Sequence, residues 1–157
     1  MARFERILHP TDFSENGRAA LPLLADVCAM SPHEDGPVVH VVHVLEPIVS
    51  TTDFTWSGLS HNELEAKRLQ AAQEALQEFA DGLSLRARNL VLEVIRGKSH
   101  EAIDRYAKEH DIELIVMATH GHTGLSHLLL GSTAELVVRT ARCPVLTVKG
   151  PVRSDDA

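Results

Sequence analysis

Aromatic residues, cysteines and basic residues are all scarce in this chain. Phe, Trp and Tyr make up 4% of its 157 residues, so the core has to be built mainly from Val, Leu, Ile and Ala. The net charge of −7 argues against a broad nucleic-acid-binding surface, because such a surface needs clustered Lys and Arg. It still allows a small anion site made from backbone amides. We therefore expect no nucleic-acid partner.

Long apolar segments are also missing. No apolar run approaches the roughly 20 residues of a transmembrane helix, and the first residues, MARFERILHPTDF, lack the apolar core of a signal peptide. Two cysteines, Cys28 and Cys143, are too few for a disulfide framework. Both lie among apolar residues, so we expect small buried side chains rather than a redox pair. These absences predict a cytoplasmic protein with no membrane partner.

Five β-rich runs alternate with helical patterns along a chain long enough for one domain. This βαβα rhythm predicts an α/β fold, a single doubly wound five-stranded parallel sheet with helices on both faces. The domain is expected over residues 1–150, with a flexible C-terminal tail over 151–157. The expected strands are Arg6–Pro10, Val38–Leu45, Asn89–Ile95, Ile112–Ala118 and Cys143–Lys149, and the expected helices are Ser14–Met30, Asn62–Leu83, one that follows Ser99 and carries Ile103 and Tyr106, and Thr133–Arg142.

Prolines and one polar stretch refine this picture. Pro22 lies inside the first helical pattern and indicates either a late helix start or a kink. Pro144, near the start of the last strand, indicates an edge position in the sheet. The long polar connection Pro47–His61 contains Phe54 and Trp56, which are costly to leave in water. We expect this connection to form a lid or a contact surface.

A glycine-rich stretch, MATHGHTGLSHLLLGSTAE, follows the fourth strand and leads into a helix. In doubly wound sheets, ligands bind beyond the carboxyl ends of the strands, where the strand order reverses. Ser132 and Glu135 form a capping-box pattern, and the amides at that helix start suit a phosphate. The glycine spacing fits neither a P-loop nor a dinucleotide fingerprint. A tight strand-to-helix connection without a ligand is an equal alternative at this point.

The same stretch resembles the nucleotide-binding branch of the universal stress protein family. That branch has Gly, two residues, Gly, nine residues, then Gly-Ser or Gly-Thr; here Gly121, nine residues and Gly131-Ser132 match it. Ala118 stands where the family has its first glycine. The resemblance extends from ILHPTDFSE through HVVHVLEP to RCPVLTVK, nearly the whole chain. It implies a Rossmann-like fold of the adenine nucleotide α-hydrolase type.

The resemblance also implies a ligand and a partner. The ligand would be ATP, alone or with Mg²⁺ or Mn²⁺. The partner would be a second copy, paired through the fifth strand at Val145, Leu146, Thr147 and Val148. The family's nucleotide-contacting positions correspond here to Pro10, Thr11, Asp12, Val44, Met117, Ala118, Gly121, His122, Gly131, Ser132 and Thr133.

Several of these residues have a plainer interpretation. Asp12 can hold ribose hydroxyls or a cation, or it can cap the next helix together with Ser14. Val44 can contact adenine or simply pack in the core. His122 stands where ATP-binding relatives often carry Arg or Lys, so its protonation would favour phosphate binding at low pH.

A metal centre is not expected. His120, His122 and His127 cluster in the glycine-rich loop, but no Cys or carboxylate completes a familiar zinc pattern. His40 and His43 share a strand at an odd spacing, so they should point to opposite faces of the sheet.

The leading hypothesis is a stress-response protein that binds ATP or a related adenine nucleotide as a homodimer. Any ATP hydrolysis would be slow, because no base or arginine finger is apparent. The rival is a universal stress protein that does not bind ATP and acts through dimerisation and partner contacts, and Ala118 favours it. An enzyme of the wider superfamily is a remote alternative, because the HxGH, KMSKS and SGGxDS signatures are absent.

Overall fold

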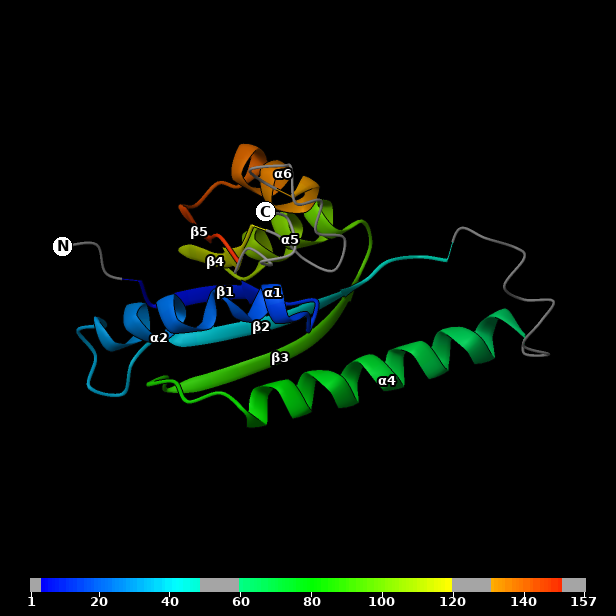
Figure 1. Ribbon diagram of the computed structural model, residues 1–157, viewed down its shortest axis with the longest axis horizontal. Coiled ribbons are helices and arrows are strands. Elements are labelled where there is room, and N and C mark those ends of the chain that lie inside the picture. The colour runs from blue at the N-terminus through cyan, green and yellow to red at the C-terminus, as the bar shows by residue number, and fades with distance from the viewer. Residues whose placement is uncertain (1–3, 49–59, 120–130, 151–157) are drawn as a thin grey trace, which may run out of the picture.

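The computed structural model describes residues 4–48, 60–119 and 131–150, and these contain one parallel sheet (Figure 1). The order of the strands is β3-β2-β1-β4-β5, so the chain winds outward from β1 in both directions. This confirms the predicted doubly wound five-stranded sheet, and it places the reversal of strand order between β1 and β4. The strands are β1 Arg6–Pro10, β2 Val38–Leu45, β3 Asn89–Arg96, β4 Leu114–Ala118 and β5 Val145–Val148.

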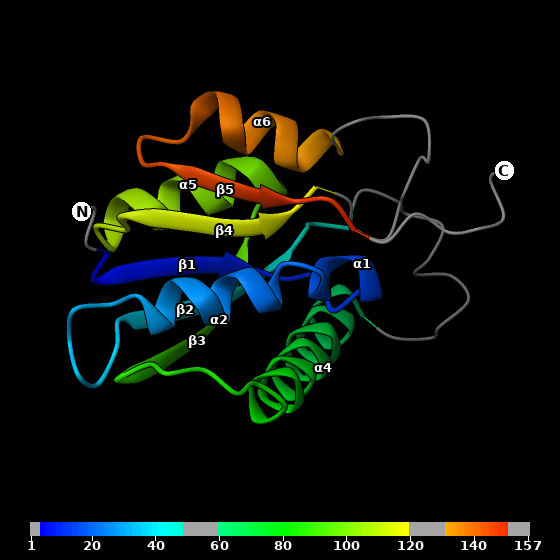
Figure 2. The same cartoon turned by 60° about the vertical axis from the view of Figure 1, so that its left-hand side comes forward.

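Helices cover both faces of the sheet (Figure 2). One face packs against α2 and α4, and the other packs against α5 and α6. Among the described helices, none has both the length and the apolar character to span a bilayer. The helices are α1 Glu15–Arg18, α2 Leu21–Ala29, α4 His61–Asp81, α5 Ser99–Glu109 and α6 Ser132–Thr140.

The core is aliphatic, as the composition requires. In β2, Val39 and Val41 face α2 and α4, while Val42 faces α5, and all three are fully buried. A strand covered on both faces gains about 1.5–3 kcal/mol for each such side chain that leaves water. This explains why β2 reads as a continuous apolar run and not as an alternating one.

The first predicted helix is wrong in its extent, because Ser14–Met30 contains two helices. Ser14 caps the short α1 by accepting a hydrogen bond from the Gly17 N–H at 2.9 Å. Pro22 lies in the first turn of α2, where its missing N–H costs nothing. Of the two alternatives for Pro22, the late start therefore holds.

The start of the last helix is also corrected. Gly131 is the N-cap of α6 and Ser132 is its first residue, so the capping box expected from Ser132 and Glu135 does not form. The Glu135 N–H instead donates to the Gly131 carbonyl at 2.9 Å, which makes that glycine the first link of the helix. The box that does form is the one at α4, between Ser60 and Glu63.

Other boundaries shift by a few residues. β4 begins at Leu114 because the Ile112 N–H still donates to the Ala107 carbonyl at the end of α5, at 2.8 Å. Helix α4 begins at His61, the last residue of the long polar connection. Phe54 and Trp56, the aromatic residues of that connection, lie outside the described residues. The predicted tail, 151–157, lies outside them too.

Candidate nucleotide site at the carboxyl edge of the sheet

A cavity of about 450 Å³ opens where the strand order reverses, beyond the carboxyl ends of β1 and β4. Its volume lies within the range of about 300–1,000 Å³ that is usual for small-molecule sites. Gly121 and His122 lie outside the described residues. The other predicted site residues line this cavity together: Pro10, Thr11, Asp12, Val44, Met117, Ala118, Gly131, Ser132 and Thr133.

Further lining residues escaped the sequence analysis. His43 lies near the carboxyl end of β2 and Glu46 directly follows that strand, so the rule that ligands gather at strand ends could have found both. Ser99 could have been found in a similar way, because it begins the helix after β3 and therefore lies at the carboxyl edge of the sheet. The full set of additional residues is Gly17, His43, Glu46, Ser99, Ile103, Thr119 and Ala134.

The turn after β1 is organised by Asp12. Its Oδ1 accepts hydrogen bonds from the Ser14 N–H at 3.0 Å and the Ser14 hydroxyl at 2.6 Å. Gly17 makes room for this carboxylate, because a Cβ there would lie 2.8 Å from Asp12 Oδ1. The plainer role considered for Asp12, support of the helix cap, is therefore present in the structure, and the residue still lines the cavity.

His43 fixes the same turn from the neighbouring strand. Its Nδ1 lies 2.9 Å from the Thr11 carbonyl oxygen, which can only accept, so that nitrogen carries a proton. The imidazole stacks on Phe13 with ring centres 4.5 Å apart. Phe13 has φ of 63°, a conformation that is rare for a bulky residue and that needs such support. His40 points to the other face, where its Nδ1 meets the Tyr106 hydroxyl at 2.9 Å, as the odd spacing predicted.

Glu46 closes the start of α5. Its Oε1 accepts hydrogen bonds from the Ser99 hydroxyl at 2.5 Å and the Ser99 N–H at 2.9 Å. These bonds favour the ionised carboxylate, so they lower the pKa of Glu46 below its ordinary value. An anion at a helix start also interacts favourably with the helix dipole. Near neutrality the cavity therefore has a fixed negative charge on this wall.

The start of α6 is arranged differently. The Gly131 N–H donates to the Thr119 carbonyl at 2.7 Å, and the Thr119 N–H donates to the Val148 carbonyl at 2.8 Å. This ties the beginning of α6 to the ends of β4 and β5. No side chain caps the following amides of α6 within the described residues. Those amides carry partial positive charge and can accept an anionic group.

No group of three or more His, Cys, Asp and Glu side chains among the described residues is arranged to hold a metal ion. His120, His122 and His127 lie outside that part of the chain.

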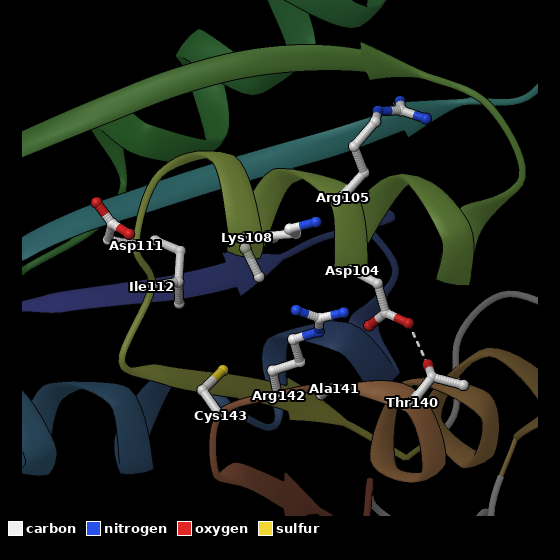
Figure 3. A pocket seen from close by; sticks show the side chains of 10 residues that line it. Asp104, Arg105, Lys108, Asp111, Ile112, Thr140, Ala141, Arg142 and Cys143 are labelled. Atoms are coloured by element: carbon white, nitrogen blue, oxygen red, sulfur yellow. Dashed lines mark hydrogen bonds between the residues drawn. The ribbon is translucent and has the colours of Figure 1, made fainter.

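A second cavity, of about 500 Å³, lies at the opposite end of the sheet (Figure 3). The carboxyl ends of α5 and α6 line it, and the Thr140 hydroxyl donates to Asp104 across the two helices. Lys108 and Arg142 are on its walls, and Figure 3 shows Arg105 directed away from it. The negative poles of two helices and the carboxylates of Asp104 and Asp111 also line this cavity, so it suits a phosphate less well than a helix start does.

Cys143 also lines this second cavity, and it is half-buried where full burial was expected. Cys28 is fully buried as predicted, and both thiols are free. Burial raises the pKa of Cys28 to about 11 and also raises the pKa of Cys143.

The fold recurs in known proteins. Two curated universal stress proteins of Methanocaldococcus jannaschii are similar: MJ0577 is 29% identical over 93% of this chain and 95% of its own length, and MJ0531 is 31% identical over 94% and 84%. The solved structure of MJ0577 superposes with a TM-score of 0.73 at 28% identity, covering 96% of this chain and 99% of that one.

The structure of UspA from Lactobacillus plantarum gives a TM-score of 0.68 at 26% identity, covering 94% of this chain and 99% of that one. More distant structures are a universal stress protein in complex with cAMP, at 18% identity and a TM-score of 0.59, and an Arabidopsis thaliana family member with AMP bound, at 17% and 0.57; their likeness is one of fold. A sequence model of the Universal stress protein family matches residues 3–149. The chain therefore belongs to the universal stress protein family.

Proposed function

We propose that this protein binds ATP or a related adenine nucleotide at the carboxyl edge of its sheet and acts as a homodimer in the stress response. The observation that carries the proposal is the cavity at the point where strand order reverses. Many of its lining residues are positions at which the resemblance to the family implies contact with a nucleotide. Two proteins of this fold have adenine nucleotides in their solved structures, which makes that ligand class the first to test.

The walls of the cavity divide into three kinds of surface. Val44, Ile103 and Met117 supply apolar side chains against which a base can pack. Asp12, at the end of β1, supplies a carboxylate within reach of ribose hydroxyls. The start of α6 supplies amides for a phosphate. Together these surfaces match the three parts of a nucleotide.

The direct test is to denature the freshly purified protein, filter it and analyse the filtrate by anion-exchange chromatography for nucleotide. Calorimetric titration of nucleotide-free protein with ATP and AMP should then give saturable binding. Val44→Phe, which fills the base position, should weaken that binding at least about tenfold because the added volume has to displace ligand or neighbours. Leu90→Phe, at the amino end of β3, is the matched control. Absence of any adenine ligand in both assays would refute the proposal.

The dimer is proposed to form through β5, the edge strand of the sheet. Leu146 on β5 and Val138 on α6 are exposed apolar residues at that edge, with exposed fractions of 37% and 47%. An open apolar edge favours pairing with another chain. The Ile115 N–H donates to the Pro144 carbonyl and the Thr119 N–H to the Val148 carbonyl, so the intervening Thr147 amide faces the open side.

Thr147→Pro is therefore expected to remove an outward N–H and leave the bonds to β4 intact. Light scattering should show a dimer for the natural sequence and a folded monomer for this variant, with unchanged circular dichroism. A monomer for the natural sequence at micromolar concentration would contradict the dimer. We also place the protein in the cytoplasm, because the free thiols of Cys28 and Cys143 suit a reducing compartment.

The rival function is supported by Ala118. This residue lines the cavity at the place where the family motif has glycine, and its methyl group packs with the apolar cluster on the α2 and α4 face of the sheet. If this methyl excludes nucleotides, the protein would act through dimerisation and partner contacts alone. A dimer with no adenine ligand in either assay is the result that would favour this rival.

A further inference from the structure

The charges around the cavity restrict which nucleotide it accepts. We propose that the cavity selects an adenine ligand with a single phosphate group, such as AMP or a cyclic monophosphate, over ATP when no divalent cation is present. This inference rests on the proposed nucleotide binding and names the ligand class for that site. It follows from the carboxylates on the walls, the shortage of cations and the occupation of the helix starts.

Two carboxylates among the described residues line the cavity, and they follow the neighbouring strands β1 and β2. Asp12 follows β1, and Glu46 follows β2 and is bonded to Ser99 of α5. Their negative charges repel each phosphate that a ligand brings. AMP carries about two negative charges and ATP about four, so the repulsion grows with the length of the phosphate chain.

Cations that would offset this repulsion are missing from the described walls. Among the described lining residues there is no Lys or Arg. By sequence, neither 49–59 nor 120–130 contains Lys or Arg. The described walls of the cavity therefore supply no permanent cation to pair with a triphosphate.

Two arginines near Glu46 are already paired with another carboxylate. Arg68 donates through Nη2 to the Glu46 backbone carbonyl at 2.9 Å and through Nη1 to Glu65 at 2.8 Å. Arg96 also donates to Glu65, at 2.8 Å. Both guanidinium groups are therefore paired with one acidic residue of α4, and neither arginine lines the cavity.

The starts of α1, α5 and α6 lie at the cavity, and the chain uses two of those starts itself. Ser14, held by Asp12, caps α1, and the Glu46 carboxylate bonds the first amide of α5. Within the described residues, only α6 begins without a side-chain cap bond at the cavity. A helix start carries roughly half an elementary positive charge, enough to help one phosphate group and far too little for three.

The test is a set of calorimetric titrations with adenosine, AMP, cyclic AMP and ATP at constant ionic strength, in chelator without divalent cation. AMP is expected to bind about tenfold more tightly than ATP. Raising the salt concentration should narrow this ratio, since screening weakens the repulsion. Adding magnesium should raise the affinity for ATP more than that for AMP, because the ion neutralises part of the triphosphate charge.

Glu46→Gln keeps an oxygen that accepts from Ser99 and removes the charge, so it should reduce the ATP-to-AMP difference by about threefold. Glu109→Gln, at the other end of α5, makes the same change in net charge and should leave the ratio unaltered. ATP binding as tightly as AMP to the natural sequence would overturn the selectivity and leave the proposed function standing. If Glu46→Gln and Glu109→Gln had the same ratio of ATP affinity to AMP affinity, the charge of Glu46 would not be the cause of the selectivity. Binding of none of the four ligands would overturn both proposals.

Discussion

The two ends of this sheet have cavities of similar size and opposite chemistry. The carboxyl-edge cavity, of about 450 Å³, is bordered by helix starts, and the amino-edge cavity, of about 500 Å³, is bordered by the ends of α5 and α6. By volume alone, the two cavities would be equally good candidates for a ligand site. The direction of the helices separates them, because only helix starts present free N–H groups and positive potential to an anion.

The side chains follow the same division. At the amino edge, Lys108 and Arg142 compensate the carbonyl ends of the helices, and Asp104 joins α5 to α6 through Thr140. These contacts stabilise helix ends, and the apolar residues of this cavity are mostly small ones such as Ala107 and Ala141. At the carboxyl edge, the larger side chains of Val44, Ile103 and Met117 provide a wall against which a base can pack. The comparison teaches that a cavity in a doubly wound fold has to be judged by which helix poles surround it.

The strongest way to sharpen this comparison is to remove one methyl group at each edge. Ala118→Gly should tighten adenine nucleotide binding roughly fivefold to 150-fold, because a methyl in a tight contact costs about 1–3 kcal/mol. Ala141→Gly removes a methyl from the amino-edge cavity and should leave the affinity unchanged. Calorimetric dissociation constants of both variants decide the matter. Equal affinities for Ala118→Gly and the natural sequence would show that the methyl is tolerated.

A second pair of variants adds a methyl group in place of removing one. Gly17→Ala would place its Cβ 2.8 Å from Asp12 Oδ1, so the carboxylate has to move and nucleotide affinity should fall about tenfold. Gly82→Ala, at the end of α4, meets the Phe79 carbonyl at an ordinary 3.5 Å and should bind nucleotide normally. Thermal unfolding should confirm that both variants fold. Normal binding by Gly17→Ala would mean that the position of Asp12 does not matter.

The sequence was sufficient to predict the sheet and the strand-end part of the site. Apolar runs that repeat between helical patterns determine a doubly wound sheet, and the carboxyl ends of its strands then have to meet. Pro10, Val44 and Met117 could be placed at one edge for this reason. These positions depend only on which residues end a buried strand.

Contacts between distant segments could not be predicted in the same way. Glu46 and Ser99 are separated by 53 residues, and their hydrogen bond depends on how β2 and α5 lie in space. The start of α6 shows the limit within one segment: Ser132 satisfies a capping pattern, but the Gly131 N–H is bonded to Thr119, and that tie begins the helix one residue earlier. Local patterns give way where a tertiary contact fixes the backbone.

Between the two edges, β1 contains a buried histidine whose titration should affect stability more than binding. His9 is 1% exposed, its Nδ1 lies 2.8 Å from the Val116 carbonyl oxygen, and its Nε2 has no partner within the described residues. Burial lowers the pKa of His9 below the ordinary 6.5. Below about pH 6.5, His9 binds a proton in the unfolded chain but stays neutral in the folded chain. The free energy of unfolding should therefore fall as pH drops from about 7 to about 5.

His9→Asn keeps an N–H for the Val116 carbonyl and removes the titration. Denaturant unfolding at several pH values should show a flatter pH dependence for this variant, by up to about 1.4 kcal/mol per pH unit. His40, whose pKa burial also lowers, contributes the part that remains. His33→Asn, at an exposed histidine, is the control for the substitution itself. An unchanged slope in His9→Asn would assign the acid sensitivity elsewhere.

The smallest expected effect tests whether the amino edge takes any part in binding. Cys143 lines that cavity and is half-buried, whereas Cys28 is fully buried, so a maleimide at about pH 8 should modify Cys143 first. The reaction should be slow, because burial raises the pKa of both thiols and keeps them protonated. Mass spectrometry identifies the modified residue, and Cys143→Ser treated in the same way is the control. The adduct occupies the amino-edge cavity, so nucleotide affinity should stay within about twofold of the unmodified protein. A larger loss that Cys143→Ser does not show would mean that the two edges are coupled, and the separation argued from their helix poles would fail.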